Sequence, residues 1–496
     1  MNGFGNTKLK KNLNSQNFLK EKLKQKAFKY YKEGNLDSFL NYCSNFISKG
    51  YKDVQLFSQY GIVLFELGFI ENSIDNFERS ICIFPDEPDL YINLSNIHKL
   101  NGDLEKSEIL IRKALELCPK SHISLSNLSI ILIKKSKFIE AEKYALIALK
   151  IDPKNSNYNY NLALIYSNTG RFNSSIMYYQ KALEFDKNYY EANLNLGAIL
   201  LKLNNFEESL TYLEIALSLK PNSYESEFNL GQLYLFTKRF KTAEQHFKNA
   251  LILSKNNWDI HKYLGIAQFM NSTKDSLDNI NQSIELNPKK NITHVLRSVI
   301  NSRVNSKGFE DHSQSNPYVD FGNKPIILNR NVDDKLIDTL YKQETLNLNE
   351  IDTSNFFGKA IGSGYKVFQE SNPVLKILEN DLIKLTSEYF KSEIFIDDSF
   401  FRILKGEGRV KKHTHLENID KLEKLDLYKN KFSLVYYIKT GDTDCSEPGF
   451  ISFYNPKDKI LPKQGMIIIF PSDRPHSVLY DGKSDRMIFS INFYSY

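Results

Sequence analysis

The sequence predicts a multidomain fold, with an N-terminal all-α superhelix followed by a mostly-β domain with flanking helices. Three observations predict this order. Leucine and small residues recur every 34 residues in the first half, a polar stretch with glycine and proline interrupts that period, and short β-type runs dominate after residue 393. Because 496 residues are too many for one hydrophobic core, more than one domain is expected.

Changes of pattern along the chain set the expected domain boundaries. Residues 1–19 form a polar N-terminal segment, and residues 20–290 hold about seven helical repeats. Residues 291–324 are expected to be a capping helix followed by a linker of polar residues, glycine and proline. The remaining residues, 325–496, are long enough for a complete second domain.

The period of the first half is clearest in a series of leucines spaced 34 residues apart. They are Leu94, Leu128, Leu162, Leu196, Leu230 and Leu264. A small residue follows each leucine, and alanines from Ala114 to Ala250 form a second series at the same spacing. A single unit of this kind cannot bury its own apolar face, so the units must stack on one another. The series resembles the tetratricopeptide repeat (TPR), in which small residues let two antiparallel helices approach closely.

An asparagine precedes the repeat leucine in five consecutive units. These asparagines are Asn93, Asn127, Asn161, Asn195 and Asn229. An amide offers both donors and an acceptor, so a row of amides can pair with the backbone of an extended peptide whatever its sequence. The row is similar to the asparagine ladder of O-linked N-acetylglucosamine transferases, which implies a peptide-binding face and a protein or peptide partner. The alternative is that these amides make hydrogen bonds between repeats.

The second half contains two amphipathic segments and then a series of β-type runs. Helices are expected over 332–350 and 373–391. The β-type runs are EIFIDDSFFRIL, FSLVYYIKT, GFISFYN, GMIIIFP, HSVLY and RMIFSINFY, separated by turns rich in glycine, aspartate and proline. Helices packed on a β core of about eight strands are typical of a double-stranded β-helix, a jelly-roll barrel.

Three of the nine histidines and one arginine form the most informative cluster in the chain. His413 and His415 are two residues apart, so on a strand both side chains point to the same face. His476 follows 61 residues after His415, and Arg486 follows ten residues after that. Imidazoles from separate strands can hold a redox-active metal in one pocket, where an arginine can bind a carboxylate. This combination predicts an oxygenase.

The motifs around these residues resemble a known enzyme family. The similar segments are KKHTHLEN, FSLVYYIKTGD, EPGFISFYNP, LPKQGMIIIFPSDRPHSV and DRMIFSINFY. The family that they resemble is that of the 2-oxoglutarate- and iron(II)-dependent oxygenases related to prolyl 4-hydroxylases. The resemblance covers residues 395–496 and extends more weakly back to residue 325. It implies a dioxygenase that hydroxylates a protein or peptide recruited by the repeats.

The resemblance also implies a role for the clustered residues. Fe(II) would be bound by His413, His415 and His476. The cosubstrate 2-oxoglutarate would chelate the metal, and its far carboxylate would pair with the permanently charged Arg486.

Two further points concern the same pocket. Alternation along the last β-type run puts Ser490 and Asn492 on the face of Arg486, so both are expected to line the cosubstrate pocket. One metal ligand has two possible assignments, because the family usually places a carboxylate two residues after the first histidine. Either His413 completes a three-histidine site, or Glu417 supplies a carboxylate ligand.

Two other functions fit parts of the pattern. A non-catalytic repeat scaffold could carry a degenerate barrel. GEGRVKKHTHLE also resembles the signature of cupin-type metal enzymes that act on sugars, although Arg486 has no role there. Next to this motif, residues 416–431 are expected to be a solvated insertion or, alternatively, a short helix or lid beside the pocket mouth.

Composition narrows the classes of partner. The net charge is +6, and the 65 basic and 59 acidic residues are interleaved, which does not predict nucleic-acid binding. The N-terminus lacks the apolar core of a signal peptide and no run is apolar enough to span a membrane, so a cytoplasmic protein is expected. The four cysteines form no CxxC pair and are expected to be free thiols.

Overall fold

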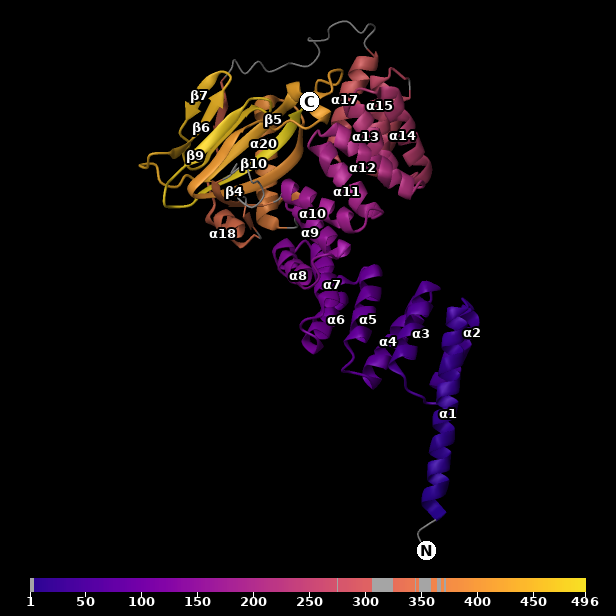
Figure 1. Cartoon of the computed structure of the whole chain (residues 1–496). Helices are drawn as coiled ribbons and strands as arrows, with labels where there is room; N and C mark the ends of the chain where they lie inside the picture. The colour runs from indigo at the N-terminus through magenta and orange to yellow at the C-terminus, as the bar shows by residue number, and fades with distance from the viewer. Residues whose placement is uncertain are drawn as a thin grey trace. The chain divides into compact units, whose positions relative to one another are not determined.

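The computed structural model describes residues 4–273, 275–305, 324–343, 345–347, 358–363, 367–369 and 372–496. The chain divides into two compact units, Met1–Ile165 and Tyr166–Tyr496. The first unit is helical, and the second combines further helices with a β-rich region (Figure 1). The chain thus has the expected order, all-α repeats and then a β-rich region. The boundary between the two compact units lies inside the repeats.

Paired helices build the first unit. They are α1 (Phe4–Lys32), α2 (Leu36–Ser48), α3 (Val54–Glu66), α4 (Ile70–Ile83), α5 (Pro88–Leu100), α6 (Leu104–Leu117), α7 (His122–Lys134) and α8 (Phe138–Ile151). Helix α9 (Ser156–Asn168) crosses the boundary between the two units. Because α1 begins at Phe4, the segment expected over 1–19 is helical over most of its length.

Small residues at the repeat positions let the two helices of a pair approach closely. A Cβ atom at Gly61 in α3 would lie 2.5 Å from the ring of Phe77 in α4. The hydroxyl of Ser95 in α5 instead donates to the carbonyl of Ser107 in α6 at 2.8 Å. A larger side chain at either position would push the pair apart, which explains the 34-residue series of small residues.

The helices of the second unit continue the repeats and then cover the β-rich region. They are α10 (Phe172–Phe185), α11 (Tyr190–Lys202), α12 (Phe206–Leu219), α13 (Tyr224–Phe236), α14 (Phe240–Leu253), α15 (Trp258–Met270), α16 (Ser276–Leu286), α17 (Asn291–Asn305), α18 (Asp334–Lys342) and α20 (Pro373–Phe390). Helix α17 takes the place of the expected capping helix, and the linker expected after it lies outside the described residues from 306 to 323.

Helix α18 ends earlier than the helix expected over 332–350. The chain turns into strand β2 (Leu346–Asn347), which pairs with Gly362 and Ile361 of β3 (Gly358–Gly362). This pairing takes the backbone groups that a longer helix would use. Residues 344 and 348–350 of the expected helix lie outside the described residues.

The strands of the described residues form one hydrogen-bonded antiparallel sheet. Besides β2 and β3 they are β1 (Ile326–Asn329), β4 (Ile394–His413), β5 (Lys431–Lys439), β6 (Pro448–Tyr454), β7 (Lys457–Ile460), β8 (Met466–Pro471), β9 (His476–Tyr480) and β10 (Arg486–Ser495). The order is β1-β8-β5-β10-β4-β9-β6-β7, with β3 also paired to β4 and β2 to β3. The long strand β4 pairs with β10 through residues 394–404 and with β9 through 408–413, and so joins two parts of the sheet.

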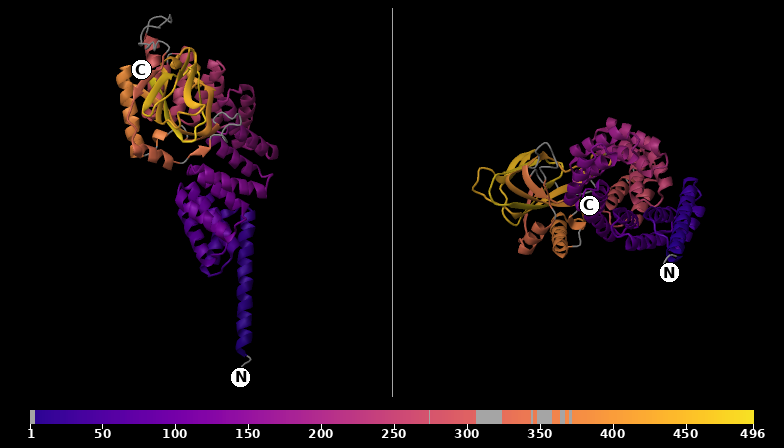
Figure 2. Two further views of the ribbon diagram at one scale, coloured as in Figure 1. Left: turned by 90° about the vertical axis from the view of Figure 1, so that its left-hand side faces the viewer. Right: turned by 60° about the horizontal axis from the view of Figure 1, so that its bottom comes forward.

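Alternation along the strands separates two apolar cores. One face of the sheet packs against the helices α18 and α20, which are orange in Figure 2. The core between them includes Leu340, Leu378 and Phe489. The opposite face packs against β6 and β9 through residues such as Ile451 and Val478. The β-rich region therefore has two layers of strands, and the histidines and Arg486 belong to the core between them.

Residues 416–430 form a docking segment between the last repeats and the β-rich region. It contains two short 3-10 helices, η2 (Ile419–Lys421) and η3 (Leu427–Asn430). Leu422 and Leu425 are buried in a core with residues of α15, α16 and α17. Lys424 Nζ donates to the Met270 carbonyl at 2.9 Å, and Arg303 forms an ion pair with Asp426 at 3.2 Å.

The expectation of a solvated insertion was therefore wrong for this segment, whereas short helices, expected as the alternative, are present as η2 and η3. The leucines of the segment are buried against the apolar surface of α15, α16 and α17. Burial of each leucine stabilises this contact by about 2 kcal/mol. This contact also explains why the last repeats and the β-rich region belong to one compact unit.

The remaining expectations from composition concern thiols and membranes. All four cysteines are free, and Cys43 is buried in the first unit. Within the described residues, no helix combines the length and the apolar character needed to cross a membrane.

Candidate metal centre and ligand cavity

Three histidines meet where β4 ends and β9 begins. His413 is the last residue of β4 and pairs in register with His476, the first residue of β9. His415 follows two residues later, where its backbone N–H donates to the Ser472 carbonyl at 2.8 Å. One ring nitrogen from each histidine lies within 4.8 Å of the others. Three nitrogen donors at this separation can bind one metal ion.

Hydrogen bonds on the far side of two rings fix their tautomers. His413 Nδ1 lies 2.9 Å from the Lys411 carbonyl, and His476 Nδ1 lies 3.2 Å from the Arg474 carbonyl. A carbonyl can only accept, so each Nδ1 carries the proton and each Nε2 keeps its lone pair. This arrangement is the one in which histidines ligate metals through Nε2.

Burial keeps the three rings neutral. It lowers the pKa of His476 to about 3, with the charge of His413 adding to the effect. Burial is also the main cause that lowers the pKa of His413 and, more strongly, that of His415. Neutral imidazole is the metal-binding form, so no proton has to leave these rings at pH 7 before a cation can bind.

A cavity of about 220 Å³ opens beside the histidines. It is lined by Phe400, Arg402, Leu404, Val410, His413, Thr414, His415, Val435, Tyr437, Ile451, His476, Val478, Arg486, Ile488 and Ser490. Its described lining holds arginines but no carboxylate. This ligand cavity therefore suits an anion that lies against a metal.

Arg486 is the clearest anion-binding group of the ligand cavity. The residue is 1% exposed, and Nη1 donates to the Pro448 carbonyl at 2.9 Å. Its Nε and Nη2 are buried and have no hydrogen-bond partner among the described residues. Gly449 makes room for the guanidinium, because a Cβ there would collide with Nη1. A buried cation with two unused donors is costly unless a ligand such as a carboxylate completes it.

Arg402 is a residue of the cavity that the sequence analysis missed. It is 4% exposed, and its Nη1 donates to the carbonyls of Ser363 and Phe401, each at 2.9 Å. Alternation could have found it, since Arg402 shares a strand face with Phe400 and Leu404 inside an apolar run.

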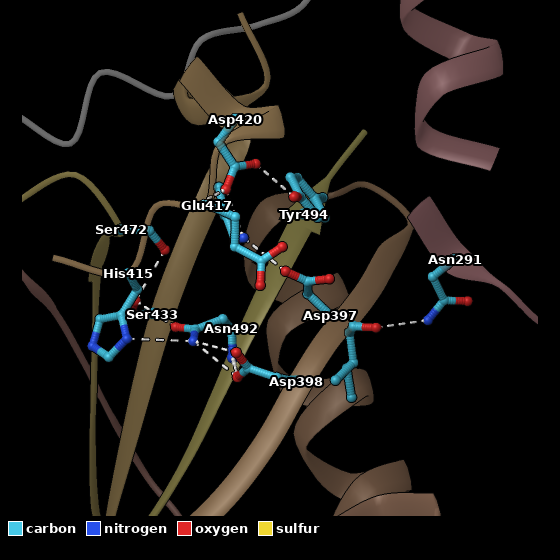
Figure 3. A network of polar contacts seen from close by, with 12 residues as sticks. Asn291, Asp397, Asp398, His415, Glu417, Asp420, Ser433, Ser472, Asn492 and Tyr494 are labelled. Carbon is cyan, nitrogen blue, oxygen red and sulfur yellow. Dashed lines mark hydrogen bonds and ion pairs between the residues drawn. The ribbon is translucent and has the colours of Figure 1, made fainter. Parts of the chain in front are cut away.

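Ser490 and Asn492 were both expected to line the pocket, and the structure separates them. Ser490 lines the ligand cavity, whereas Asn492 is not among its lining residues. Instead Asn492 Nδ2 donates to both carboxylate oxygens of Asp398, at 2.8 and 2.9 Å, and lies 3.4 Å from His415 Nδ1 (Figure 3). Asn492 therefore supports a histidine and does not face the ligand.

Glu417 lies outside the group of possible metal ligands. Its side chain extends toward Asp397, while His415 extends toward Asn492 (Figure 3). Glu417 lines a second cavity of about 330 Å³, here called the junction cavity, between α15, the start of α17 and the sheet. The geometry therefore groups His413, and not Glu417, with the other two histidines.

The repeats supply the aromatic wall of the junction cavity. Tyr263 lies 34 residues after Asn229, so it occupies the next position of the asparagine series. The Trp258 ring has two lysines near it, with Lys262 Nζ at 5.1 Å and Lys290 Nζ at 5.4 Å from its centroid. The opposite wall contains Asp398, which is hydrogen-bonded to the residue that supports His415.

The asparagine series is not uniform. Asn93 Nδ2 donates to Ser58 Oγ at 3.1 Å, and Asn161 Nδ2 donates to Ser126 Oγ at 2.9 Å. Each serine lies 35 residues earlier, in the preceding repeat. Asn161 is only 5% exposed. These two amides therefore join neighbouring repeats, which is the alternative role for the series.

The matching positions differ for the other three asparagines. The residue 35 positions before Asn127 is Ile92, and the residue 35 positions before Asn229 is Leu194, so neither offers a hydroxyl. For Asn195 the matching residue is Tyr160, which does offer a hydroxyl. Asn127 and Asn229 thus remain the better candidates for contact with a peptide.

Comparison with known proteins identifies the repeats. Residues 88–121, 156–189 and 224–257 match one sequence profile of the tetratricopeptide repeat, and residues 178–211 match another. The helical array therefore contains tetratricopeptide repeats within residues 88–257. Repeats of this kind generally bind proteins or peptides. No curated protein is significantly similar to the chain.

Several solved structures are similar to part of the chain, and two of them are described as tetratricopeptide repeat proteins. A tetratricopeptide repeat protein from Parabacteroides merdae has 14% identity and a TM-score of 0.43, over 50% of this chain and 98% of its own. YrrB, described as a TPR protein with an unusual peptide-binding site, has 21% identity and a TM-score of 0.31, over 37% of this chain and 95% of its own. PilF of Pseudomonas aeruginosa has 20% identity and a TM-score of 0.39, over 42% of this chain and 96% of its own.

Proposed function

We propose that the chain is an Fe(II)- and 2-oxoglutarate-dependent dioxygenase that hydroxylates a protein or peptide recruited by its repeats. The β-rich region would then be a double-stranded β-helix. One observation carries the proposal. Three neutral histidines and a buried arginine with unused donors, Arg486, line the same cavity.

The donor set fits a metal that also binds other ligands. Imidazole nitrogen is a good ligand for Fe(II), and three such ligands leave positions open on a six-coordinate ion. His413 and His476 present Nε2 lone pairs, fixed by the backbone carbonyls behind them. The rings cannot rotate without loss of these hydrogen bonds, so the protein holds the ligands in place.

The cavity fits the cosubstrate at its other end. The unused Nε and Nη2 of Arg486 form the fork that binds a carboxylate through two parallel hydrogen bonds. On β10, Arg486 lies six residues before Asn492, the residue that supports His415. Arg486 pairs with Leu404 of β4, so it lies at the end of the cavity away from His415. When bound, iron and 2-oxoglutarate would supply oxidative attack on a C–H bond, with conversion of 2-oxoglutarate to succinate.

The repeats support a polypeptide substrate. The asparagine series leads by its own 34-residue period to Tyr263 in the wall of the junction cavity. That cavity is separated from the histidines by Asp398 and Asn492. A peptide that lies along Asn229 and Tyr263 would thus run toward the metal centre.

The test is release of succinate from 2-oxoglutarate by the purified full-length chain with Fe(II), ascorbate and oxygen. Turnover that disappears in His476→Ala but persists in His294→Gln, a change of a histidine on α17, would support the proposal. Absence of turnover together with unchanged 2-oxoglutarate affinity in Arg486→Ala would contradict it. That outcome would favour a non-catalytic scaffold.

A further inference from the structure

Asn492 is held from several sides and yet does not face the ligand cavity. The residue is 3% exposed, and its Oδ1 accepts a hydrogen bond from Ser433 Oγ at 2.7 Å. Its Nδ2 donates to Asp398 and lies 3.4 Å from His415 Nδ1 (Figure 3). The amide therefore lies between a buried carboxylate and one of the three histidines.

The direction of this amide decides which tautomer of His415 is stable. In the observed direction Asn492 turns N–H donors toward His415, so Nδ1 has to be the acceptor and the ring proton is on Nε2. From Nε2 the proton can be donated to His476 Nε2, 3.4 Å away. A metal ion needs the Nε2 lone pair of His415, which requires the proton on Nδ1 and an acceptor opposite it. A half turn of the Asn492 amide would supply Oδ1 as that acceptor.

Asp398 decides whether the turned amide is stable. An ionised carboxylate can only accept, so it holds Nδ2 toward itself, whereas a protonated one can donate to Oδ1. Ser433 permits either direction, because a hydroxyl both donates and accepts. A proton on Asp398 therefore favours the amide direction that metal binding needs.

The surroundings of Asp398 raise its pKa, so that the carboxyl can take up a proton near neutral pH. The pKa of Asp398 is raised to about 7, mainly by burial. The hydrogen bonds from Asn492 lower the pKa, whereas the charges of Asp397 and Glu417 raise it. Lys431 on β5 lowers the pKa, but its Nζ is shared by Asp397 at 2.7 Å and Asp420 at 2.8 Å. From the repeat side, Lys262 and Lys290 line the same junction cavity.

We propose that Asn492 is a positioning residue that selects the metal-binding tautomer of His415, and that Asp398 sets the direction of its amide. The inference rests on the proposed metal centre. The protons balance as follows: His415 keeps one ring proton, which moves from Nε2 to Nδ1, and Asp398 takes one proton from solvent. Metal binding is then linked to proton uptake, whereas histidine sites ordinarily release protons when they bind metal.

The experiment measures Co(II) binding by visible absorption on the full-length chain between pH 6.5 and 8.5. In the wild type the dissociation constant should rise about tenfold per pH unit above pH 7, as expected for uptake of one proton. Asp398→Asn should bind tightly without this dependence, because a carboxamide donates as the protonated acid does. Asn492→Leu should bind about 10- to 100-fold more weakly, which is typical of a lost support behind a metal ligand.

Asp397→Asn is the matched control. It removes a neighbouring carboxylate that does not bond Asn492, so the pH dependence should persist with a lower midpoint, because the charge of Asp397 raises the pKa of Asp398. Thermal unfolding of each variant checks that it is folded. If Asn492→Leu does not fold, the pH dependence of Co(II) binding is compared between Asp398→Asn and the wild type. That comparison alone then tests the inference.

The outcomes separate the inference from the proposed function. Wild-type affinity in Asn492→Leu, or an unchanged pH dependence in Asp398→Asn, would overturn the inference alone. A wild-type chain that binds no Co(II) would remove the metal centre and the inference with it. Absence of succinate release with the expected Co(II) behaviour would count against the oxygenase and leave the positioning role standing.

Discussion

The Nε2 atoms of His415 and His476 lie 3.4 Å apart, although 61 residues separate the two histidines along the chain. The register of β4 and β9 creates this contact, because it places His413 opposite His476 and carries His415 past the end of the strand. The three histidines of the candidate metal centre therefore come together only when β4 and β9 pair in this register.

The two possible third ligands can be distinguished by a pair of substitutions. His413→Ala should weaken Fe(II) or Co(II) binding by more than about a hundredfold, because it removes a ligand and not merely its support. Glu417→Gln should leave the affinity unchanged, because Glu417 lines the junction cavity. Metal titration of both variants checks this, and the reverse ranking would assign the ligand to Glu417.

Acid should destabilise the fold through His476. The pKa of its ring is lowered from 6.5 to about 3 in the folded chain, so below pH 6.5 the unfolded chain binds a proton that the folded chain does not. The stability present above pH 6.5 is lost toward pH 3, by roughly 1.4 kcal/mol for each pH unit. Denaturant unfolding of wild type and His476→Gln measures this. Equal slopes against pH would show that His476 is not buried as a neutral ring.

Arg486 should bind the carboxylate of 2-oxoglutarate that lies farther from the metal. Arg486→Gln should weaken 2-oxoglutarate binding to the Mn(II)-loaded chain by about a hundredfold, the value of a charge-assisted bidentate pair. Binding of 2-oxopentanoate, which lacks the far carboxylate, should hardly change. Calorimetry with both ligands provides the comparison, and Arg409→Gln on the same sheet is the matched control. Equal losses for the two ligands would place Arg486 elsewhere on the cosubstrate.

Asn161 and Asn127 should behave differently although they occupy equivalent positions. Asn161→Ala should lower the free energy of unfolding by about 1 kcal/mol, because the buried amide loses its bond to Ser126. Asn127→Ala should leave stability almost unchanged, since the matching position holds Ile92. Chemical denaturation distinguishes the two, and similar losses would mean that both amides join repeats. Peptide capture should instead be weakened by Asn127→Ala.

Local patterns were sufficient for most of the secondary structure. The 34-residue period predicted helix pairs because a leucine and a small residue at fixed spacing must face the same partner in every unit. The six β-type runs became strands because they are short and rich in β-branched and aromatic residues, which suits a sheet with two covered faces. The helix expected over 332–350 was shorter, because Leu346 pairs with Gly362 of strand β3. That strand lies outside the segment from which the helix was predicted.

Contacts between segments far apart in the chain determine the placement of the docking segment and of the Asn492 side chain, which local sequence patterns did not predict. The docking segment was mistaken for a solvated insertion, because its leucines find their apolar partners only on α15, α16 and α17. Asn492 was assigned to the cosubstrate pocket by strand alternation, but Asp398 on the neighbouring strand draws its amide toward His415.

By itself the sequence determined the repeats, the order of helices and strands, and the residue types of the candidate centre. These follow from local periodicity and from rare side chains, which are visible without knowledge of the fold. Only the tertiary structure brought His413, His415 and His476 within reach of one ion and left two donors of Arg486 unused in the same cavity. Those relations depend on the register between strands far apart in the chain, which no local pattern specifies.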